Sequence, residues 1–95
     1  MTEAALERSC CLLAKKRGVR SIKLQSGIVG EPDRLFLLPG QRCWLVEFKQ
    51  PGEPLRPRQK IVHAEYAALG HPVSVMVDRV GFKVVLDRKL QATVD

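Results

Sequence analysis

The sequence has 95 residues, enough for one domain with a single buried core but not for a second lobe. Lys and Arg number 16 against 10 acidic residues, and the net charge of +6 favours a polyanionic partner, either nucleic acid or an anionic membrane surface. No apolar run reaches the ~20 residues of a transmembrane helix and the N-terminus lacks a signal-peptide pattern, so a cytoplasmic protein without a membrane span is expected.

The first predicted element is a helix from about Ala4 to Arg17, with Thr2 available as its N-cap. Three apolar residues at helical spacing form a stripe that should dock on the rest of the fold: Leu6, Cys10 and Leu13. Glu7 lies at the edge of this stripe, so its side chain can face the rim of the core. Glu3 lies one turn earlier, nearer the end of the helix, and is expected to be solvated.

Three strands are predicted next. The segment VRSIKLQ at 19–25 is the first, and SGIVGEPD at 26–33 follows as a loop with two glycines and a proline. Strands at Arg34–Leu38 and Cys43–Lys49 should form an antiparallel hairpin through the turn PGQR. Side chains alternate along the last strand, so one face carries Cys43, Leu45, Glu47 and Lys49 and the other carries Trp44, Val46 and Phe48.

A second helix is predicted from Pro57 to about Leu69, because proline favours the first helical turn. Gln59 should point inward at its start, and the buried stripe should continue through Val62, Tyr66 and Leu69. The segment PVSVMV at 72–77 indicates a buried strand, and the helix before it favours parallel pairing.

The tail from Asp78 to Asp95 is expected to hold a turn, a short strand at FKVVL and a short helical piece. The order helix, three strands, helix, strand predicts an α/β fold in which helices flank a central mixed sheet.

Three charged residues interrupt apolar strands: Asp33 before one strand, and Glu47 and Lys49 within the next. On adjacent strands the two carboxylates can meet at one end of the sheet, where they repel unless a hard cation lies between them. Mg²⁺ suits such a site because it takes one or two carboxylates and completes its shell with water and phosphate oxygens. The pattern therefore indicates a metal ion that polarises a phosphodiester and activates water, with Lys49 orienting that water or neutralising charge on the phosphate.

Simpler interpretations stay open for several residues. Asp33 could be a turn residue, and Glu47 with Lys49 an exposed ion pair at a strand end. His63 and His71 are expected to have surface or packing roles, because no second ligand falls at metal spacing. The cysteines are expected to be reduced thiols that form neither a disulfide frame nor a zinc site: Cys10, Cys11 and Cys43.

The chain from the helix that contains Glu7 to PVSVMV resembles the virus-type replication-repair nuclease (VRR-Nuc) family, a branch of the PD-(D/E)xK phosphodiesterases. A bare D…ExK pattern recurs often by chance, and a longer series makes the match specific: Gly30, Pro32, Asp33, the LLPG turn, Glu47-Phe48-Lys49, Pro51-Gly52 and LRPRQ. The resemblance implies a restriction-endonuclease-like fold and one nuclease domain at 1–95, with a matched core at 1–78 and a divergent tail at 79–95.

Position by position, the resemblance implies four metal ligands: Asp33, Glu47, the Phe48 backbone carbonyl and Glu7 on the first helix. It implies that Lys49 is the catalytic lysine and that Gln59 is the family's helix glutamine beside the active site. Basic residues are expected to contact DNA phosphates: Lys23, Arg34, Arg56, Arg58 and Lys60.

The resemblance further implies an endonuclease that depends on Mg²⁺ or Mn²⁺. Free-standing members resemble Holliday junction resolvases, so we expect a homodimer that cuts branched DNA, with four-way junctions as the leading substrate. A phage or prophage gene expressed in the bacterial cytoplasm would fit this role.

The sequence leaves three alternatives to this function. Flaps, nicked duplex or single strands are alternative substrates for the same chemistry. A non-catalytic DNA-binding or recombination accessory protein is a different class, which the convergence of three acids on one buried edge disfavours. A membrane-surface protein would need a basic amphipathic helix with exposed bulky apolar residues, which neither predicted helix shows.

Overall fold

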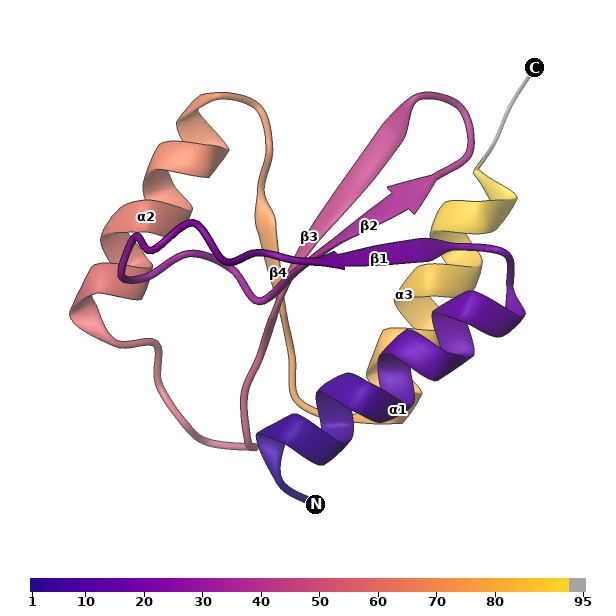
Figure 1. Ribbon diagram of the computed structural model, residues 1–95, viewed down its shortest axis with the longest axis horizontal. Helices are drawn as coiled ribbons and strands as arrows, with labels where there is room; N and C mark the ends of the chain where they lie inside the picture. The colour runs from indigo at the N-terminus through magenta and orange to yellow at the C-terminus, as the bar shows by residue number, and fades with distance from the viewer. Residues whose placement is uncertain (93–95) are drawn as a thin grey trace.

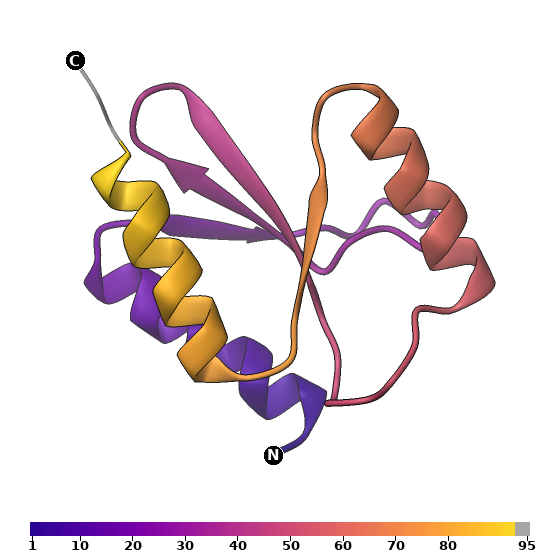
Figure 2. The same cartoon turned by 180° about the vertical axis from the view of Figure 1, so that it is seen from behind.

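A four-stranded sheet in the order β1-β2-β3-β4 organises the chain, as the computed structural model of residues 1–92 shows (Figures 1 and 2). The elements along the chain are α1 (Glu3–Lys16), β1 (Arg20–Lys23), β2 (Arg34–Leu38), β3 (Arg42–Phe48), α2 (Pro57–Ala68), β4 (Val73–Met76) and α3 (Arg79–Gln91). The first two strand pairs are antiparallel, whereas β4 pairs with β3 in parallel after the helical crossover through α2. These observations confirm the predicted α/β class, the mixed sheet and the order α-β-β-β-α-β.

The two faces of β3 have different partners, as its alternating pattern predicts. Trp44, Val46 and Phe48 are buried in the main core together with apolar residues of α1 and α3. The opposite face carries Leu45 and Glu47, and α2 lies on this side of the sheet (Figure 1). Glu47 is therefore buried on the face that the main core does not occupy.

Helix α1 begins and docks as predicted. The Thr2 Oγ1 accepts a hydrogen bond from the Ala5 N–H at 3.1 Å, and Leu6, Cys10 and Leu13 are buried. At the other end of the helix, the Arg17 guanidinium pairs with Asp87 of α3 at 2.9 Å. No helix in residues 1–92 is long and apolar enough to cross a membrane.

The tail prediction was wrong, because the segment FKVVL belongs to the helix α3 and not to a strand. The Asp78 Oδ1 caps this helix by accepting a hydrogen bond from the Gly81 N–H at 2.6 Å. Phe82 and Leu86, four residues apart, are both fully buried. The Phe82 ring stacks on Trp44 at 5.0 Å, so burial of one helical stripe overrides the strand preference of the two valines between them. Residues 93–95, the end of the tail prediction, lie outside the described residues.

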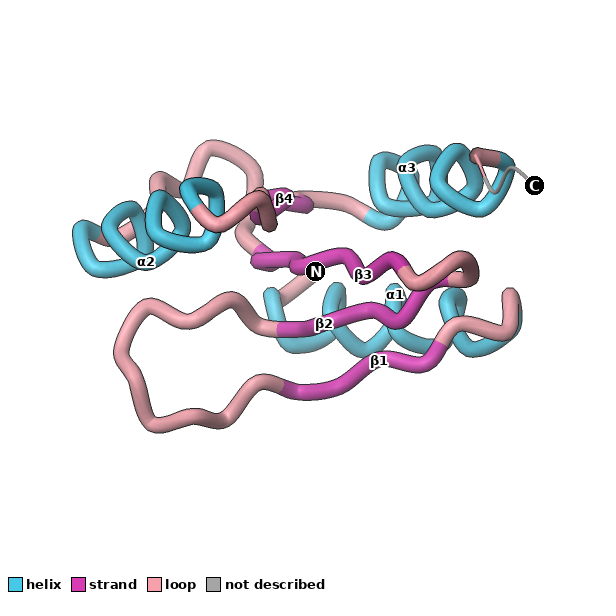
Figure 3. Tube along the Cα trace, turned by 90° about the horizontal axis from the view of Figure 1, so that it is seen from above, coloured by secondary structure: helices cyan, strands magenta, loops and turns pink. Residues whose placement is uncertain are grey.

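The loop between β1 and β2 extends beyond the strand ends and reaches α2 (Figure 3). Gly30 has φ +97°, and a Cβ atom on it would lie 2.6 Å from the Arg58 carbonyl oxygen, so only glycine permits this approach. The Tyr66 hydroxyl donates a hydrogen bond to the Glu31 carboxylate at 2.9 Å. These contacts fix the chain that leads into Asp33.

The predicted stripe of α2 was partly wrong, because Val62 is buried whereas Leu69 is 76% exposed.

Phe82→Ala tests whether α3 is part of the core. We expect the free energy of unfolding to fall by about 3–5 kcal/mol, because the substitution leaves a cavity among three aromatic rings. Urea denaturation would measure the loss. Val84→Ala on the same helix is the control, and because Val84 is 48% exposed its loss should stay below about 1 kcal/mol. Equal losses in the two variants would contradict the observed packing.

Candidate active site

Asp33 and Glu47 lie opposite each other at one end of the β2–β3 pair. The register pairs Arg34 with Val46, and the Asp33 N–H donates to the Val46 carbonyl at 3.1 Å, which extends the ladder by one position. The Asp33 Oδ2 accepts a hydrogen bond from the Phe48 N–H at 2.8 Å. The alternative that Asp33 is simply a turn residue therefore does not account for its side chain, which is hydrogen-bonded to β3.

Glu47 is 2% exposed and only partly compensated. Its Oε2 accepts a hydrogen bond from the Gln59 Nε2 at 3.1 Å, whereas its Oε1 is buried and has no hydrogen-bond partner. Burial, followed by the charge of Asp33, raises the pKa of Glu47 to about 8. The charge of Lys49 lowers this pKa only in part.

Lys49 is also 2% exposed, which excludes the exposed ion pair considered from the sequence. Its Nζ lies 3.7 Å from the Glu53 carboxylate, in the loop that follows β3. Lys49 lines a cavity of about 310 Å³ together with Glu3 and Gln50. Buried lysines are rare unless they are paired, so this ammonium has a local electrostatic role.

Gln59 points inward, as predicted, and its amide is fixed in orientation. Its Oε1 accepts a hydrogen bond from the Arg56 N–H at 2.8 Å, at the start of α2. The amide nitrogen is therefore directed at Glu47. One side chain thus caps the helix and holds an oxygen of the central carboxylate.

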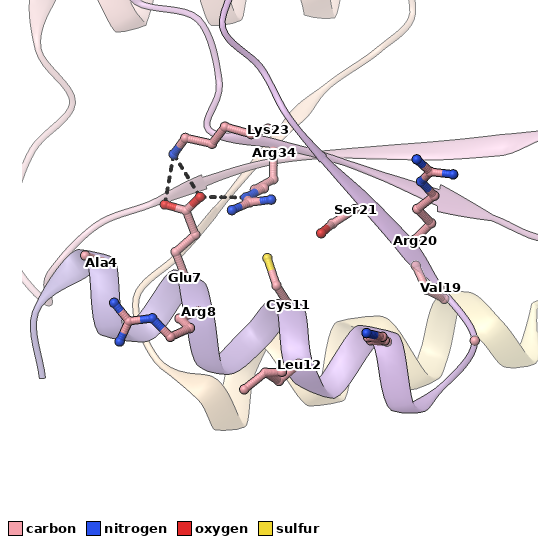
Figure 4. Close-up of a pocket in the computed structure, with 12 residues that line it drawn as sticks. Ala4, Glu7, Arg8, Cys11, Leu12, Val19, Arg20, Ser21, Lys23 and Arg34 are labelled. Atoms are coloured by element: carbon pink, nitrogen blue, oxygen red, sulfur yellow. Dashed lines mark hydrogen bonds and ion pairs between the residues drawn. The ribbon is translucent and has the colours of Figure 1, made fainter.

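Glu7 faces the rim of the core, as predicted, but it contacts two cations and not the carboxylates of Asp33 and Glu47 (Figure 4). Its carboxylate binds the Arg34 Nε at 2.6 Å and the Lys23 Nζ at 2.8 Å. Partial burial opposes ionisation, but these hydrogen bonds outweigh it and hold the pKa of Glu7 below its usual value. In residues 1–92 no hydrogen bond or ion pair joins Glu7 to Asp33 or Glu47, so the structure does not bring it into the central group.

Glu3, predicted to be solvated, is instead partly buried beside the Lys49 side chain. A hydrogen bond between the carboxyl groups of Glu3 and Glu53 raises the pKa of Glu3, and its charge also acts on Glu47. The position of Glu3 in the sequence does not indicate this partial burial, because the burial depends on the distant loop that carries Glu53.

The predicted DNA-contacting residues fall in two places. Arg56, Arg58 and Lys60 are exposed at the start of α2, beside Gln59. Lys23 and Arg34 border a groove of about 800 Å³ between α1 and β1 (Figure 4). Further cations that the sequence analysis did not single out for DNA contact line the same groove: Arg8 and Arg20.

His63, which the sequence analysis expected to have a surface or packing role, lies beside the candidate site. It lies on α2 one turn after Gln59, and its Nε2 is 3.5 Å from the Glu47 Oε1. Burial lowers the pKa of His63, so the ring is neutral near pH 7. The spacing of four residues from Gln59 places both on one helix face and was a usable signal.

The residues present fit a divalent cation. Residues 1–92 contain no group of three or more His, Cys, Asp and Glu side chains already arranged to hold a metal ion. The unpaired Glu47 Oε1 and the raised pKa beside Asp33 nevertheless mark a place where positive charge would relieve both burial and repulsion. Asp33, Glu47 and the Phe48 carbonyl are the groups that could supply oxygen ligands there.

Comparisons with known proteins agree with this geometry. No family model matches the chain. It is 40% identical over 75 residues to "Putative nuclease p44" of Acyrthosiphon pisum secondary endosymbiont phage 1, covering 78% of this chain and 81% of that protein. A solved structure described as a VRR_NUC domain superposes with a TM-score of 0.80 at 24% identity, covering 90% of this chain and 94% of the other.

The fold and the relatives define the class of protein, a small α/β nuclease. The chain belongs to the VRR-Nuc family, as the resemblance of its sequence motifs predicted.

The pH dependence of the free energy of unfolding tests whether the pKa of Glu47 is raised in the folded protein. The pKa of Glu47 is about 8 in the folded protein against 4.5 for an ordinary glutamate, so the folded state binds more protons than the unfolded state between these two pH values. This contribution to stability therefore declines as the pH rises from 4.5 to 8. In EDTA, we expect Glu47→Gln to be roughly 1–3 kcal/mol more stable than the unmodified protein at pH 8 and nearly equal to it at pH 4.5.

Urea denaturation at both pH values would measure the difference. Glu65→Gln is the matched control, because Glu65 is exposed on the same region of chain, at the outer side of α2. A Glu47→Gln variant that tracks this control at every pH would contradict the assigned electrostatics.

Proposed function

We propose that this nuclease is a metal-dependent endonuclease that cuts branched DNA as a homodimer, with four-way junctions as its leading substrate. The observation that carries the proposal is the buried Glu47, which lies beside Asp33 and Lys49 with one oxygen unpaired. A buried carboxylate whose charge is not fully compensated destabilises the folded state. A protein with a purely structural role would gain nothing from this arrangement.

Each residue has a chemical role in this proposal. Asp33, Glu47 and the Phe48 carbonyl would hold Mg²⁺ or Mn²⁺, which lowers the pKa of bound water and polarises the scissile phosphodiester. The Phe48 N–H fixes Asp33, and Gln59 fixes Glu47, so the two carboxylates are oriented before substrate arrives. Lys49 would orient the attacking water or neutralise the charge that develops on the phosphate.

Glu7 is proposed as a further ligand only after a rearrangement. Lys23 and Arg34 hold its carboxylate, and phosphates of bound DNA would compete for the same two cations. Release of Glu7 would then let α1 contribute an acid to the metal site. The role implied by the family resemblance is in this way compatible with the observed ion pairs.

The basic surfaces support a nucleic-acid substrate. The groove between α1 and β1 and the start of α2 both carry exposed cations that could contact phosphates on either side of the cleavage site. The groove adjoins the site through Arg34, which follows Asp33 in the chain. Recognition of this kind reads the path of the backbone, and so the shape of the DNA, more than its sequence.

A homodimer would supply the two active sites that paired cuts in a junction require. The sheet face on the α2 side leaves apolar side chains partly exposed, namely Ile22, Leu37 and Val75 at 39–43%. Burial of this face against a second copy would contribute to dimer stability. Expression from a phage or prophage gene in a bacterial host is consistent with the phage relative.

Cleavage of a labelled synthetic four-way junction in Mg²⁺ or Mn²⁺ is the direct test. We expect paired symmetric nicks, and a loss of at least about 100-fold in rate for Asp33→Asn and for Lys49→Met, because each removes a group that contacts metal or reacting phosphate. Glu65→Gln should cut at the unmodified rate. Undiminished cutting by either site variant would exclude the assigned residues.

A panel of flap, nicked, single-stranded and linear DNAs separates the alternative substrates. Equal rates on all of them would remove the junction preference and leave the nuclease chemistry. Junction binding without any cleavage, unaffected by Glu47→Ala, would favour the accessory-protein class. Sedimentation of the free protein and its DNA complex would measure the proposed dimer.

The groove makes a separate prediction about affinity. The double substitution Arg8→Ala and Arg20→Ala should weaken DNA binding and reduce the slope of log affinity against log salt by about 2, because each contact with a phosphate contributes about 1. Fluorescence anisotropy at several salt concentrations, with Ca²⁺ in place of Mg²⁺, would measure it. Lys83→Ala with Arg88→Ala removes the same charge from the exposed side of α3, outside the groove, and should change the slope less.

A further inference from the structure

Two buried atoms without hydrogen-bond partners face each other at the end of β3. The Glu47 Oε1 and the His63 Nε2 lie 3.5 Å apart, and the side chains are only 3% and 10% exposed. An unsatisfied buried polar group destabilises the folded state, and here two such groups are adjacent. The pair therefore calls for a physical explanation beyond packing.

A simple ion pair does not explain the distance. A protonated imidazole would donate a charge-assisted hydrogen bond to the carboxylate at about 2.7–2.9 Å, well short of the observed separation. The separation suits a different relationship. Two atoms that each lie about 2.1 Å from one ion, at tetrahedral to octahedral angles, are about 3.0–3.4 Å apart.

The helix α2 presents its two polar side chains to different oxygens of one carboxylate. Gln59 donates to the Glu47 Oε2, and His63, one turn later, faces the Oε1. Asp33 approaches from the neighbouring strand on the same face of the sheet. The oxygen that Gln59 leaves free thus faces one imidazole nitrogen, and the charge of Asp33 acts on the same carboxyl group.

We propose that the His63 Nε2 is a nitrogen ligand of the metal site and shares one ion with the Glu47 Oε1. The inference rests on the proposed function, because it concerns the same metal. Mg²⁺ prefers oxygen ligands, whereas imidazole suits first-row transition ions. The site consequently selects Mn²⁺, or a later ion such as Co²⁺, over Mg²⁺.

Pulsed electron paramagnetic resonance of the Mn²⁺-loaded protein tests the ligand itself. Directly bound imidazole gives a nitrogen hyperfine coupling that carboxylate and water ligands do not give. We expect this coupling in the unmodified protein and in His71→Gln, whose imidazole is exposed beyond the end of α2. We expect it to be absent in His63→Gln.

Calorimetric titration gives the selectivity. His63→Gln should weaken Mn²⁺ binding at least about 10-fold and change Mg²⁺ binding less than about 3-fold, because only the first ion gains from nitrogen. Bound Mn²⁺ without nitrogen coupling in the unmodified protein would overturn the role of His63 and leave the nuclease proposal intact. Failure of the unmodified protein to bind Mn²⁺ would likewise overturn the role of His63, and failure to bind both Mn²⁺ and Mg²⁺ would overturn the nuclease proposal as well. Neither result needs a variant to be folded.

Discussion

The close approach of two carboxylates at the end of the β2–β3 pair is the constraint on which the rest of the structure depends. Asp33 and Glu47 repel each other in a place where Glu47 is almost completely buried. Hydrogen bonds from the Phe48 N–H and the Gln59 amide hold them there. The free energy for this comes from the other face of the sheet, where α1 and α3 bury aromatic and aliphatic side chains.

The remaining elements position groups around that pair. The loop before Asp33 is fixed on α2 by the close approach of Gly30 and by the Tyr66–Glu31 hydrogen bond. The parallel pairing of β4 with β3 places α2 over the face that carries Glu47. Two side chains of this one helix therefore face the two oxygens of the Glu47 carboxylate, with Gln59 at Oε2 and His63 at Oε1.

Charge outside the centre is arranged in separate groups. Glu7 is neutralised by two cations at the mouth of the α1–β1 groove, while Glu3, Glu53 and Lys49 form a second group behind β3. Both groups adjoin the central carboxylates, so binding of a polyanion or a cation would redistribute ion pairs at the site. This sensitivity fits the proposed DNA substrate and the proposed metal ion, both of which carry high charge.

The sequence by itself determined the strands, the first two helices, the inward Gln59 and the pairing of Asp33 with Glu47, because these follow from periods of two and 3.6 residues and from local caps. It was wrong on three features: α3, which it expected to contain a strand; Leu69, which it expected on the buried stripe of α2; and Glu3, which it expected to be solvated. The position of α3, the environment of Glu3 and the approach of His63 to Glu47 depend on partners far away in the chain, so only the tertiary structure decided them. Phe82 lies in a helix because its ring stacks on Trp44 in the core, and Glu3 is partly buried because its carboxyl group is hydrogen-bonded to Glu53. His63 faces Glu47 because the crossover to β4 places α2 over the site. The spacing of Gln59 and His63 indicates only that they share a helix face, because long-range burial and charge pairing leave no periodic trace in a single sequence.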